Sequence, residues 1–588
     1  MTELMPAGGY ISGVAKRALS PRDAIRWIAR FEPHDIATVM LLATLVFVAL
    51  LTYKGYAISN DEGVQHQYGE LIIAYYTSGF RDQSLFSFQN LYLYGGMFDI
   101  IAVGLSHLVP VDPYDLRHIV CALMGIGGIG AAAATGRLIA GPRAGLIAAT
   151  SLTLCGAWYG SMFNHTKDIP FAAAMIGATL FLIRIARLLP SPRAGDIAAF
   201  GLLAGAACGE RVIGLLLAIY VGFAIVLYLP WRDRDGTRLR FAVKSLVSML
   251  PALTLAYVIM ILAWPWAALA PLNPIRGLLA FSEFNYSIRT VLVGQIYEMA
   301  DVPRLYVPIY IAIRVPLLML FGAALAMISA GLPGRASNSG QHRAITLVSL
   351  MVIFPLACQV IWRGPAFTGM RHFLFLIPAL AVLAGIGLDK ALAALTTRGR
   401  MAASGGLAIV TAGFLWDAVT LIRLHPYEYL FYNSLVGGLE GASRRYDLDY
   451  WFSSMPEAIG QLEAYLRRTA PGDANWSTEV YSVAVCGERL PFEKAVTLPQ
   501  LHWDFMPEWK QSQFFIAPTQ LNCDRDLDGE IVGAVERLGV TIAYVKDRRA
   551  LTRPVASATS DRASAEYSLS VCPETSGRIA EFSEHEAD

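Results

Sequence analysis

Long apolar segments recur along most of this chain, and they constrain its fold more than any other feature. Most of them reach the ~20 residues that an α-helix needs to cross the ~30 Å hydrocarbon core of a bilayer. They lie near residues 36–55, 116–137, 143–161, 169–189, 243–268, 307–331, 344–362, 371–393 and 403–424. A further segment, 195–230, is long enough for two shorter spans broken at Cys208-Gly-Glu-Arg211. The sequence therefore predicts a polytopic α-helical membrane protein.

The composition agrees with a chain that lies mostly in lipid. Of its 588 residues, 55% are hydrophobic and 16% are charged, against roughly 25% charged residues in soluble domains. The formal net charge is +1 and no Lys/Arg-rich run is present, so no nucleic-acid partner is expected. The lipid bilayer is the first partner that the sequence predicts.

Charged residues beside the spans predict the orientation. Segment 1–35 carries basic residues ahead of the first span and is expected to be cytoplasmic. The apolar run 91–109 contains Asp99 and His107, so it either spans or lies at the interface. If it lies at the interface, the basic loops that follow fall on the cytoplasmic side, whereas a span would invert this bias. We therefore expect about eleven transmembrane helices, additional interfacial helices and an exported C-terminal region.

The region after the last span has the composition of a folded polar domain. A transmembrane domain is predicted over 36–425, with outer loops 56–115, 162–168, 270–306 and 362–371, and a small periplasmic α/β domain over 426–550. The expected elements of the small domain are helices at 455–468 and 529–538 and strands at 480–486, 514–518 and 541–545. Residues 551–588 are rich in Ser, Ala and Glu and are predicted to be disordered.

Three of the seven cysteines lie in this exported region. They are Cys486, Cys523 and Cys572, and the chain has no CxxC motif that would indicate a zinc ribbon or a redox site. One disulfide could form among them outside the cytoplasm, and the pairing stays open.

Two acidic motifs fall on the predicted outer face. Asp61 and Glu62 follow the first span, and a carboxylate there could act as a general base on an acceptor hydroxyl. The alternative is an acidic loop exposed to solvent. Asp168 ends the polar turn Asn164-His-Thr-Lys-Asp168 and precedes Pro170, which is also the pattern of an ordinary helix N-cap. The polar residues before Asp168 are harder to explain as capping.

Basic residues open another apolar segment on the same face. Arg371 and His372 end the motif 362–372, where a cation could neutralise a lipid-linked phosphate. The alternative is an interfacial arginine whose stem lies along lipid. Loop 270–306 mixes charged and aromatic residues, which is typical of an amphipathic segment at the membrane surface that could also line an acceptor groove.

Taken together, these motifs resemble the C-type membrane glycosyltransferases that use polyprenyl-phosphate sugars, a superfamily that includes protein O-mannosyltransferases and the lipid A aminoarabinose transferase. The likeness covers roughly residues 35–425 and depends on the order and common side of motifs that are individually weak. They are the acidic pair, the Lys-Asp-Ile-Pro-Phe turn, Asp-Val-Pro-Arg-Leu-Tyr-Val-Pro308 and Arg-His-Phe-Leu-Phe-Leu-Ile-Pro378. The run 91–109 is similar to the juxtamembrane helices of that superfamily.

The resemblance implies roles for individual residues. Asp61 corresponds to the base, Glu62 to the neighbouring acid and Asp168 to the second acid. The mannosyltransferases usually carry an arginine several residues before the second acid, where this chain has Asn164, His165 and Lys167. The residues expected to contact the donor phosphate or sugar are Tyr68, Asn164, His165, Lys167, Arg371 and His372.

The reaction implied is an inverting sugar transfer on the periplasmic face of a bacterial inner membrane. A polyprenyl-phosphate sugar is the donor, and the acceptor is a hydroxyl of a glycolipid, a polysaccharide or a protein. No cofactor is expected, because the leaving group is a lipid phosphate and not a nucleotide diphosphate. Some relatives use a divalent ion near the acidic pair, so a metal stays open.

Two other functions are alternatives to this interpretation. A transporter or flippase would use Asp61 and Asp168 as proton or substrate sites, but such proteins tend to carry their charges at the bilayer midplane and to contain inverted repeats. Here the acids lie at span ends and no repeat is visible. A non-catalytic assembly protein that acts through its exported tail would not require paired outer carboxylates.

Overall fold

A computed structural model of the chain describes residues 32–231, 233, 235–282, 288–331, 340–469 and 479–552. Nearly all of the predicted cytoplasmic segment lies outside the described residues, as do Cys572 and residues 553–588 of the predicted disordered tail.

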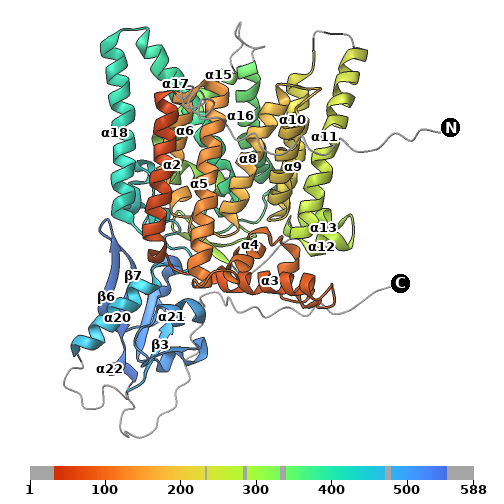
Figure 1. Cartoon of the computed structure of the whole chain (residues 1–588). Coiled ribbons are helices and arrows are strands. Elements are labelled where there is room, and N and C mark those ends of the chain that lie inside the picture. Colours follow the sequence, from red (N-terminus) through yellow and green to blue (C-terminus); the bar gives the residue numbers. More distant parts are fainter. Residues whose placement is uncertain are drawn as a thin grey trace, which may run out of the picture.

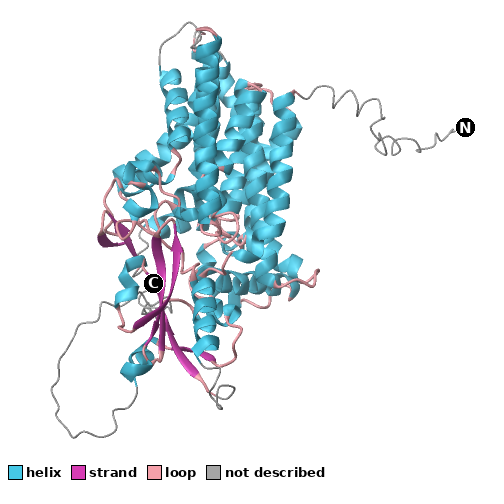
Figure 2. Ribbon diagram, turned by 90° about the vertical axis from the view of Figure 1, so that its left-hand side faces the viewer, coloured by secondary structure: helices cyan, strands magenta, loops and turns pink. Residues whose placement is uncertain are grey.

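Most of the described chain forms a bundle of helices that lie side by side, with a small sheet domain at one end (Figures 1 and 2). The bundle helices are α2 (Pro33–Thr52), α5 (Pro113–Ala140), α6 (Pro142–Thr153), α8 (Asp168–Ala186), α9 (Ala194–Cys208), α10 (Leu216–Tyr228), α11 (Asp235–Ala263), α14 (Tyr306–Arg314), α15 (Leu317–Gly331), α16 (Gly340–Trp362), α17 (Ile377–Thr396) and α18 (Arg400–Leu424). Helix α17 is almost entirely buried, whereas α2 and α18 are mostly exposed and present apolar side chains such as Trp416 and Ile422 at the periphery. The bundle is therefore apolar both inside and outside, as a lipid-embedded protein requires.

Fewer helices are long enough to cross a membrane than the sequence predicts. Among the described residues, seven helices are long and apolar enough to cross a bilayer, or eight if α14 and α15, which meet at 116°, count as one span. Helix α6 has 12 residues where a span over 143–161 is predicted, and α9 and α10 have 15 and 13 residues. The polytopic helical class is confirmed, and the count of eleven is not.

Short helices lie at the end of the bundle that also carries the sheet domain (Figure 1). They are α3 (Asn60–Thr77), α4 (Met97–Ser106), α12 (Pro265–Leu269) and α13 (Asn273–Ser282). The 10 residues of α4 extend about 15 Å, too short to cross a bilayer, so 91–109 does not form a span. Helix α13 exposes Ile275, Leu278 and Leu279, which agrees with the amphipathic surface segment predicted for this loop. A hairpin of β1 (Arg289–Leu292) and β2 (Gln295–Glu298) follows.

The C-terminal domain is a mixed sheet packed against helices, as predicted. Its elements are α19 (Gly438–Ala442), α20 (Met455–Thr469), β3 (Tyr481–Val485), α21 (Arg489–Ala495), β4 (Leu501–Asp504), β5 (Phe514–Pro518), β6 (Glu530–Arg537), β7 (Val540–Asp547) and α22 (Arg549–Thr552). The strand order is β4-β3-β5-β7-β6, parallel among β4, β3 and β5 and antiparallel from β5 through β7 to β6. The predicted helix at 455–468 and the three predicted strands are confirmed.

The helix predicted at 529–538 is wrong, because this segment is strand β6 paired with β7. Its apolar residues fit a helical spacing, but Ile531, Val532 and Val535 are β-branched and favour a strand. Leu538 and Gly539 both have positive φ, at 51° and 79°, and join Arg537 to Val540 as a two-residue turn. Such a turn matches the twist of a hairpin and ends a helix.

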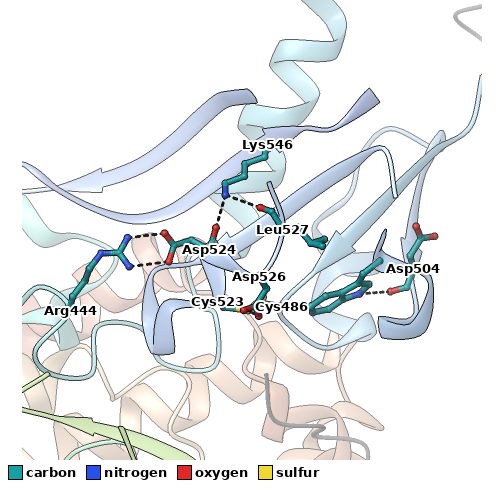
Figure 3. The surroundings of a disulfide bond; sticks show 9 residues. Arg444, Cys486, Asp504, Cys523, Asp524, Asp526, Leu527 and Lys546 are labelled. Carbon is teal, nitrogen blue, oxygen red and sulfur yellow. Dashed lines mark hydrogen bonds and ion pairs between the residues drawn. A yellow bond between two sulfur atoms is a disulfide. The ribbon is translucent and has the colours of Figure 1, made fainter. Parts of the chain in front are cut away.

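A disulfide ties two parts of the C-terminal domain together (Figure 3). It joins Cys486, directly after β3, to Cys523, which confirms that one disulfide forms in this region. Nearby, Arg444 donates to the Asp524 carboxylate at 2.8 Å and 3.1 Å. Lys546 donates to the main-chain oxygen of Asp524 at 2.6 Å. These contacts fix the sheet against the segment that leaves the membrane part of the chain.

Candidate active site

One arginine connects the two acidic motifs. Arg371, the first residue of the 3₁₀ helix η5 (Arg371–Leu376), donates its Nε to the Asp168 carboxylate at 2.8 Å. Its Nη2 donates to the carboxylate of Asp61. Asp168 lies 203 residues and Asp61 310 residues from Arg371 along the chain, so the fold brings three separate motifs to one point.

A second arginine completes this cluster. Arg211 places its Nη2 at 2.5 Å from the other oxygen of Asp168, so that carboxylate lies between two guanidinium groups. The side chains of Asp168 and Arg371 are 2% and 7% exposed, whereas the side chain of Asp61 is 31% exposed. Asp61 is therefore the carboxylate of this group that a substrate can reach.

The neighbouring acid, Glu62, serves a different purpose. It is fully buried, and its carboxylate accepts the backbone N–H of Ser59 at 2.8 Å, which closes a capping box at the start of α3. It also lies 3.0 Å from Nε2 of His118 on α5. Glu62 thus anchors the helix turn that carries Asp61.

The site forms where helices begin. Asp61 lies in the first turn of α3, Asp168 is the first residue of α8, and Arg371 opens η5 ahead of α17. Carboxylates are favoured at helix N-termini by the exposed N–H groups and the helix dipole. The N-cap interpretation of Asp168 does not hold, because Lys167 is the N-cap residue and the carboxylate of Asp168 is held by the two arginines.

His165 and Asn164 connect this cluster to the C-terminal region. The imidazole of His165 stacks on the ring of Tyr450 at 3.7 Å, and its Nδ1 is 3.1 Å from Oδ1 of Asn164. Burial lowers the pKa of His165 to about 3, so the ring is neutral at physiological pH. Asn164 donates to the carbonyl of Ala57 at 3.3 Å and to Oγ of Ser453 at 3.4 Å.

A cavity opens beside this cluster, and both the membrane part and the C-terminal region line it. Its polar lining residues are Ser161, His165, Arg314, Thr368, Arg371, Tyr429, Asp447, Asp449 and Tyr450. The segment that follows α19 therefore forms one wall of the cavity. Burial raises the pKa of Asp449, whose carboxylate accepts hydrogen bonds from Tyr429, Ser454 and the backbone of Tyr450.

Two predicted donor-binding residues lie in a separate buried cluster. Lys167 is 3.3 Å from Asp99 and donates to the carbonyl of Gly95 at 3.2 Å, and its ammonium lies 5.6 Å from the centre of the Tyr68 ring. The hydroxyl of Tyr68 donates to the carbonyl of Tyr94 at 3.1 Å. Lys167 and Tyr68 therefore contact protein groups away from the cavity.

The same buried cluster contains Arg117 and Glu210. Arg117 donates to Asp99 at 2.7 Å, and Glu210 accepts the backbone N–H of Phe98 at 2.7 Å. Burial raises the pKa of Glu210 to about 8. The dipeptides Lys167-Asp168 and Glu210-Arg211 each contribute one residue to this cluster and one to the site, so the buried cluster fixes the backbone that presents Asp168 and Arg211.

His372 lies at the edge of the site. It is half-buried, and its ring packs edge-on against Phe367 at 4.7 Å. Within the described part of the chain its ring makes no hydrogen bond, so its position next to Arg371 is its main connection to the cluster.

Several residues at the site were not predicted. Arg211 lies in the break between two apolar segments, and a charged pair inside such a break was the signal that could have identified it. Arg314 lies at the bend between α14 and α15. Tyr450 and Asp449 come from the exported region, and their sequence carries no sign that they return to the membrane surface.

Among the described residues, one group of potential ligand side chains lies close enough together to hold a metal ion. It comprises Cys486, Cys523 and Asp526 in the C-terminal domain, and the two cysteines form the disulfide. At the acidic cluster, the carboxylates of Asp61 and Asp168 face arginines. Cationic side chains already neutralise the charge that a divalent ion would neutralise there.

No protein-family model matches this sequence, and no curated protein sequence matches it. Similar solved structures exist. ArnT from Cupriavidus metallidurans in the apo state is 15% identical, with a TM-score of 0.43 over 90% of this chain and 99% of that chain. ArnT was also solved bound to undecaprenyl phosphate, with a TM-score of 0.45.

Two other similar structures are sugar transferases by name. The oligosaccharyltransferase of Archaeoglobus fulgidus is 12% identical, with a TM-score of 0.46 over 81% of this chain and 65% of that chain. The arabinofuranosyltransferase AftD from Mycobacteria is 13% identical, with a TM-score of 0.39 over 86% of this chain and 41% of that chain. These likenesses are remote, at 12% to 15% sequence identity.

Proposed function

We propose that this protein is an inverting glycosyltransferase that moves a sugar from a polyprenyl-phosphate donor to an acceptor hydroxyl. The observation that carries the proposal is Arg371, which holds the accessible carboxylate of Asp61 and the buried carboxylate of Asp168 beside a polar cavity. A base and a cation side by side at the end of a helical bundle suit a reaction between a hydroxyl and a lipid phosphate ester.

The proposed chemistry is a single displacement. Asp61 removes the proton from the acceptor hydroxyl, the hydroxyl oxygen forms a bond to the anomeric carbon, and the bond from that carbon to the phosphate oxygen breaks. Arg371, supported by Arg211 and Asp168, neutralises the charge that develops on the departing phosphate. Because attack and departure occur on opposite faces of the sugar, the configuration at the anomeric carbon is inverted.

The proposed side of the reaction is the periplasmic face of a bacterial inner membrane. The site and the sheet domain lie at the same end of the bundle, opposite the end where α2 begins (Figure 1). At that opposite end, Arg137 pairs with Asp35 and Arg143 pairs with Asp389. Arg137 lies in the last turn of α5 and Arg143 at the start of α6, so both arginines lie on the side where α2 begins, which supports a cytoplasmic N-terminus.

A donor panel tests the proposal. Purified full-length protein is incubated with a membrane extract and radiolabelled polyprenyl-phosphate mannose, aminoarabinose or galacturonic acid. We expect label to move from one donor into a product that identifies the acceptor as glycolipid, polysaccharide or protein. If no donor is used and the protein instead moves a lipid-linked or polar solute across liposomes, the transporter alternative replaces this proposal.

A further inference from the structure

The C-terminal region contributes a wall of the cavity through the short segment 446–454. Within it, Asp447, Asp449 and Tyr450 line the cavity together with His165 and Arg371. This segment connects α19 to α20, so it joins the membrane part of the chain to the sheet domain. The proposed donor site is incomplete without it.

Tyr450 occupies a distinctive position in this wall. Its side chain is 2% exposed, its ring stacks on His165 at 3.7 Å, and the Arg371 guanidinium lies 5.1 Å from the ring centre. The hydroxyl of Tyr450 is buried and has no hydrogen-bond partner among the described residues. A buried hydroxyl without a hydrogen-bond partner destabilises a folded protein. Its presence therefore indicates that a bound ligand supplies the missing partner.

Neighbouring tyrosines show that this is not a general feature of the region. Tyr429 donates to Asp449 at 2.8 Å, Tyr432 donates to the carbonyl of Asp447 at 2.6 Å, and Tyr427 donates to Glu457 at 2.9 Å. All three hydroxyls thus have protein partners, and that of Tyr450 differs from them.

The backbone holds Tyr450 firmly in place. The Asp449 carboxylate accepts the N–H of Tyr450 at 2.8 Å and the hydroxyl of Ser454 at 2.5 Å. Trp451 and Phe452 both adopt left-handed backbone conformations, with φ of 47° and 56°. Bulky residues rarely adopt such conformations, and those that do cluster at functional sites.

We propose that the Tyr450 hydroxyl donates a hydrogen bond to an oxygen of the donor's phosphate. The inference rests on the proposed function and adds the exported region to the donor site. Phosphate is favoured over the sugar because the ring lies against Arg371 and because a second cation, Arg314, lines the same cavity. The phenol beside the Arg371 guanidinium is a neutral hydrogen-bond donor for one of the phosphate oxygens.

The test compares Tyr450→Phe with Tyr427→Phe in full-length protein, using undecaprenyl phosphate without a sugar as the ligand. Tyr450→Phe keeps the ring contacts and removes the hydroxyl. We expect its affinity for undecaprenyl phosphate to fall about 10- to 100-fold and its ligand-induced rise in Tm to shrink. Its Tm without ligand is expected to stay the same or rise, because a buried unpaired hydroxyl has been removed. Tyr427→Phe is expected to show the reverse: a lower Tm without ligand and unchanged affinity.

Three outcomes would overturn the assignment. If Tyr450→Phe binds undecaprenyl phosphate like the wild type, the hydroxyl does not contact phosphate. If only binding of the sugar-charged donor weakens, the hydroxyl contacts the sugar instead. If the wild type itself does not bind undecaprenyl phosphate, the proposed function fails and this assignment fails with it. A loss of affinity confined to Tyr450→Phe supports both.

Discussion

Two adjacent acids at the start of α3 have different environments, although the sequence presents them as a pair. Asp61 is 31% exposed and lies against Arg371, whereas Glu62 is fully buried against His118. The difference follows from the helix register, because Glu62 occupies the third helical position, which a capping box requires, and Asp61 the second. The sequence predicts the acidic motif, but only the position of the helix start shows that Glu62 caps the helix and that Asp61 faces Arg371.

Replacing Glu62 with Gln should therefore affect stability more than transfer. The amide oxygen can still accept the N–H of Ser59, but the ion pair with His118 is lost. We expect a loss of about 1–3 kcal/mol in the free energy of unfolding, seen as a lower Tm, with transfer per folded molecule retained. A loss of transfer at unchanged Tm would instead place Glu62 in the catalytic step.

Close backbone contact between elements positions the cavity wall. The short helix α7 (Gly156–Tyr159) and Gly160 lie directly against the segment after α18, which contains the 3₁₀ helix η6 (Glu428–Leu430). A Cβ on Gly160 would lie 2.2 Å from the backbone nitrogen of Tyr429. The hydroxyl of Tyr429 donates to the Asp449 carboxylate, which also accepts the N–H of Tyr450. The contact at Gly160 therefore helps to position Tyr450.

Gly160→Ala is therefore expected to damage both stability and transfer. The added methyl group meets backbone that cannot move aside, and overpacking of this kind costs about 1–3 kcal/mol. The matched control is Gly127→Ala on α5, where an added Cβ meets nothing within 4 Å. Thermal unfolding and transfer rate are measured for both. Equal behaviour of the two variants would contradict the role given to the Gly160 contact.

At the scale of the whole molecule, the lipid-facing helices were the most predictable part. Hydrocarbon accepts only segments that satisfy their own backbone hydrogen bonds, so long apolar runs leave little choice of structure. Segments such as 143–161 and 195–230 were less predictable, because apolar composition does not show where a buried helix stops. The sequence predicts a helix in place of strand β6 because the apolar residues of this segment also fit a helical spacing.

The site was predictable in part for a related reason. The sequence predicts a common site for Asp61, Asp168 and Arg371 because each lies beside a span end on one predicted side, and the structure brings all three together. Lys167 is predicted at the site because the related mannosyltransferases carry an arginine several residues before the second acid, yet the turn before α8 directs Lys167 to Asp99. Arg211 and Tyr450 reach the site through tertiary packing, which a linear pattern does not encode.

The central claim is that the Asp61 carboxylate, held by Arg371, removes the acceptor proton. The most direct measurement is the single-turnover rate of sugar transfer by purified protein preloaded with labelled donor, for wild type and Asp61→Asn. The control is Glu70→Gln, which alters an acid on the same helix that lies 3.0 Å from His107 and outside the cluster. We predict a fall of about 10²- to 10⁴-fold in rate for Asp61→Asn at unchanged Tm, and a wild-type rate for Glu70→Gln. Transfer by Asp61→Asn at the wild-type rate would contradict the account.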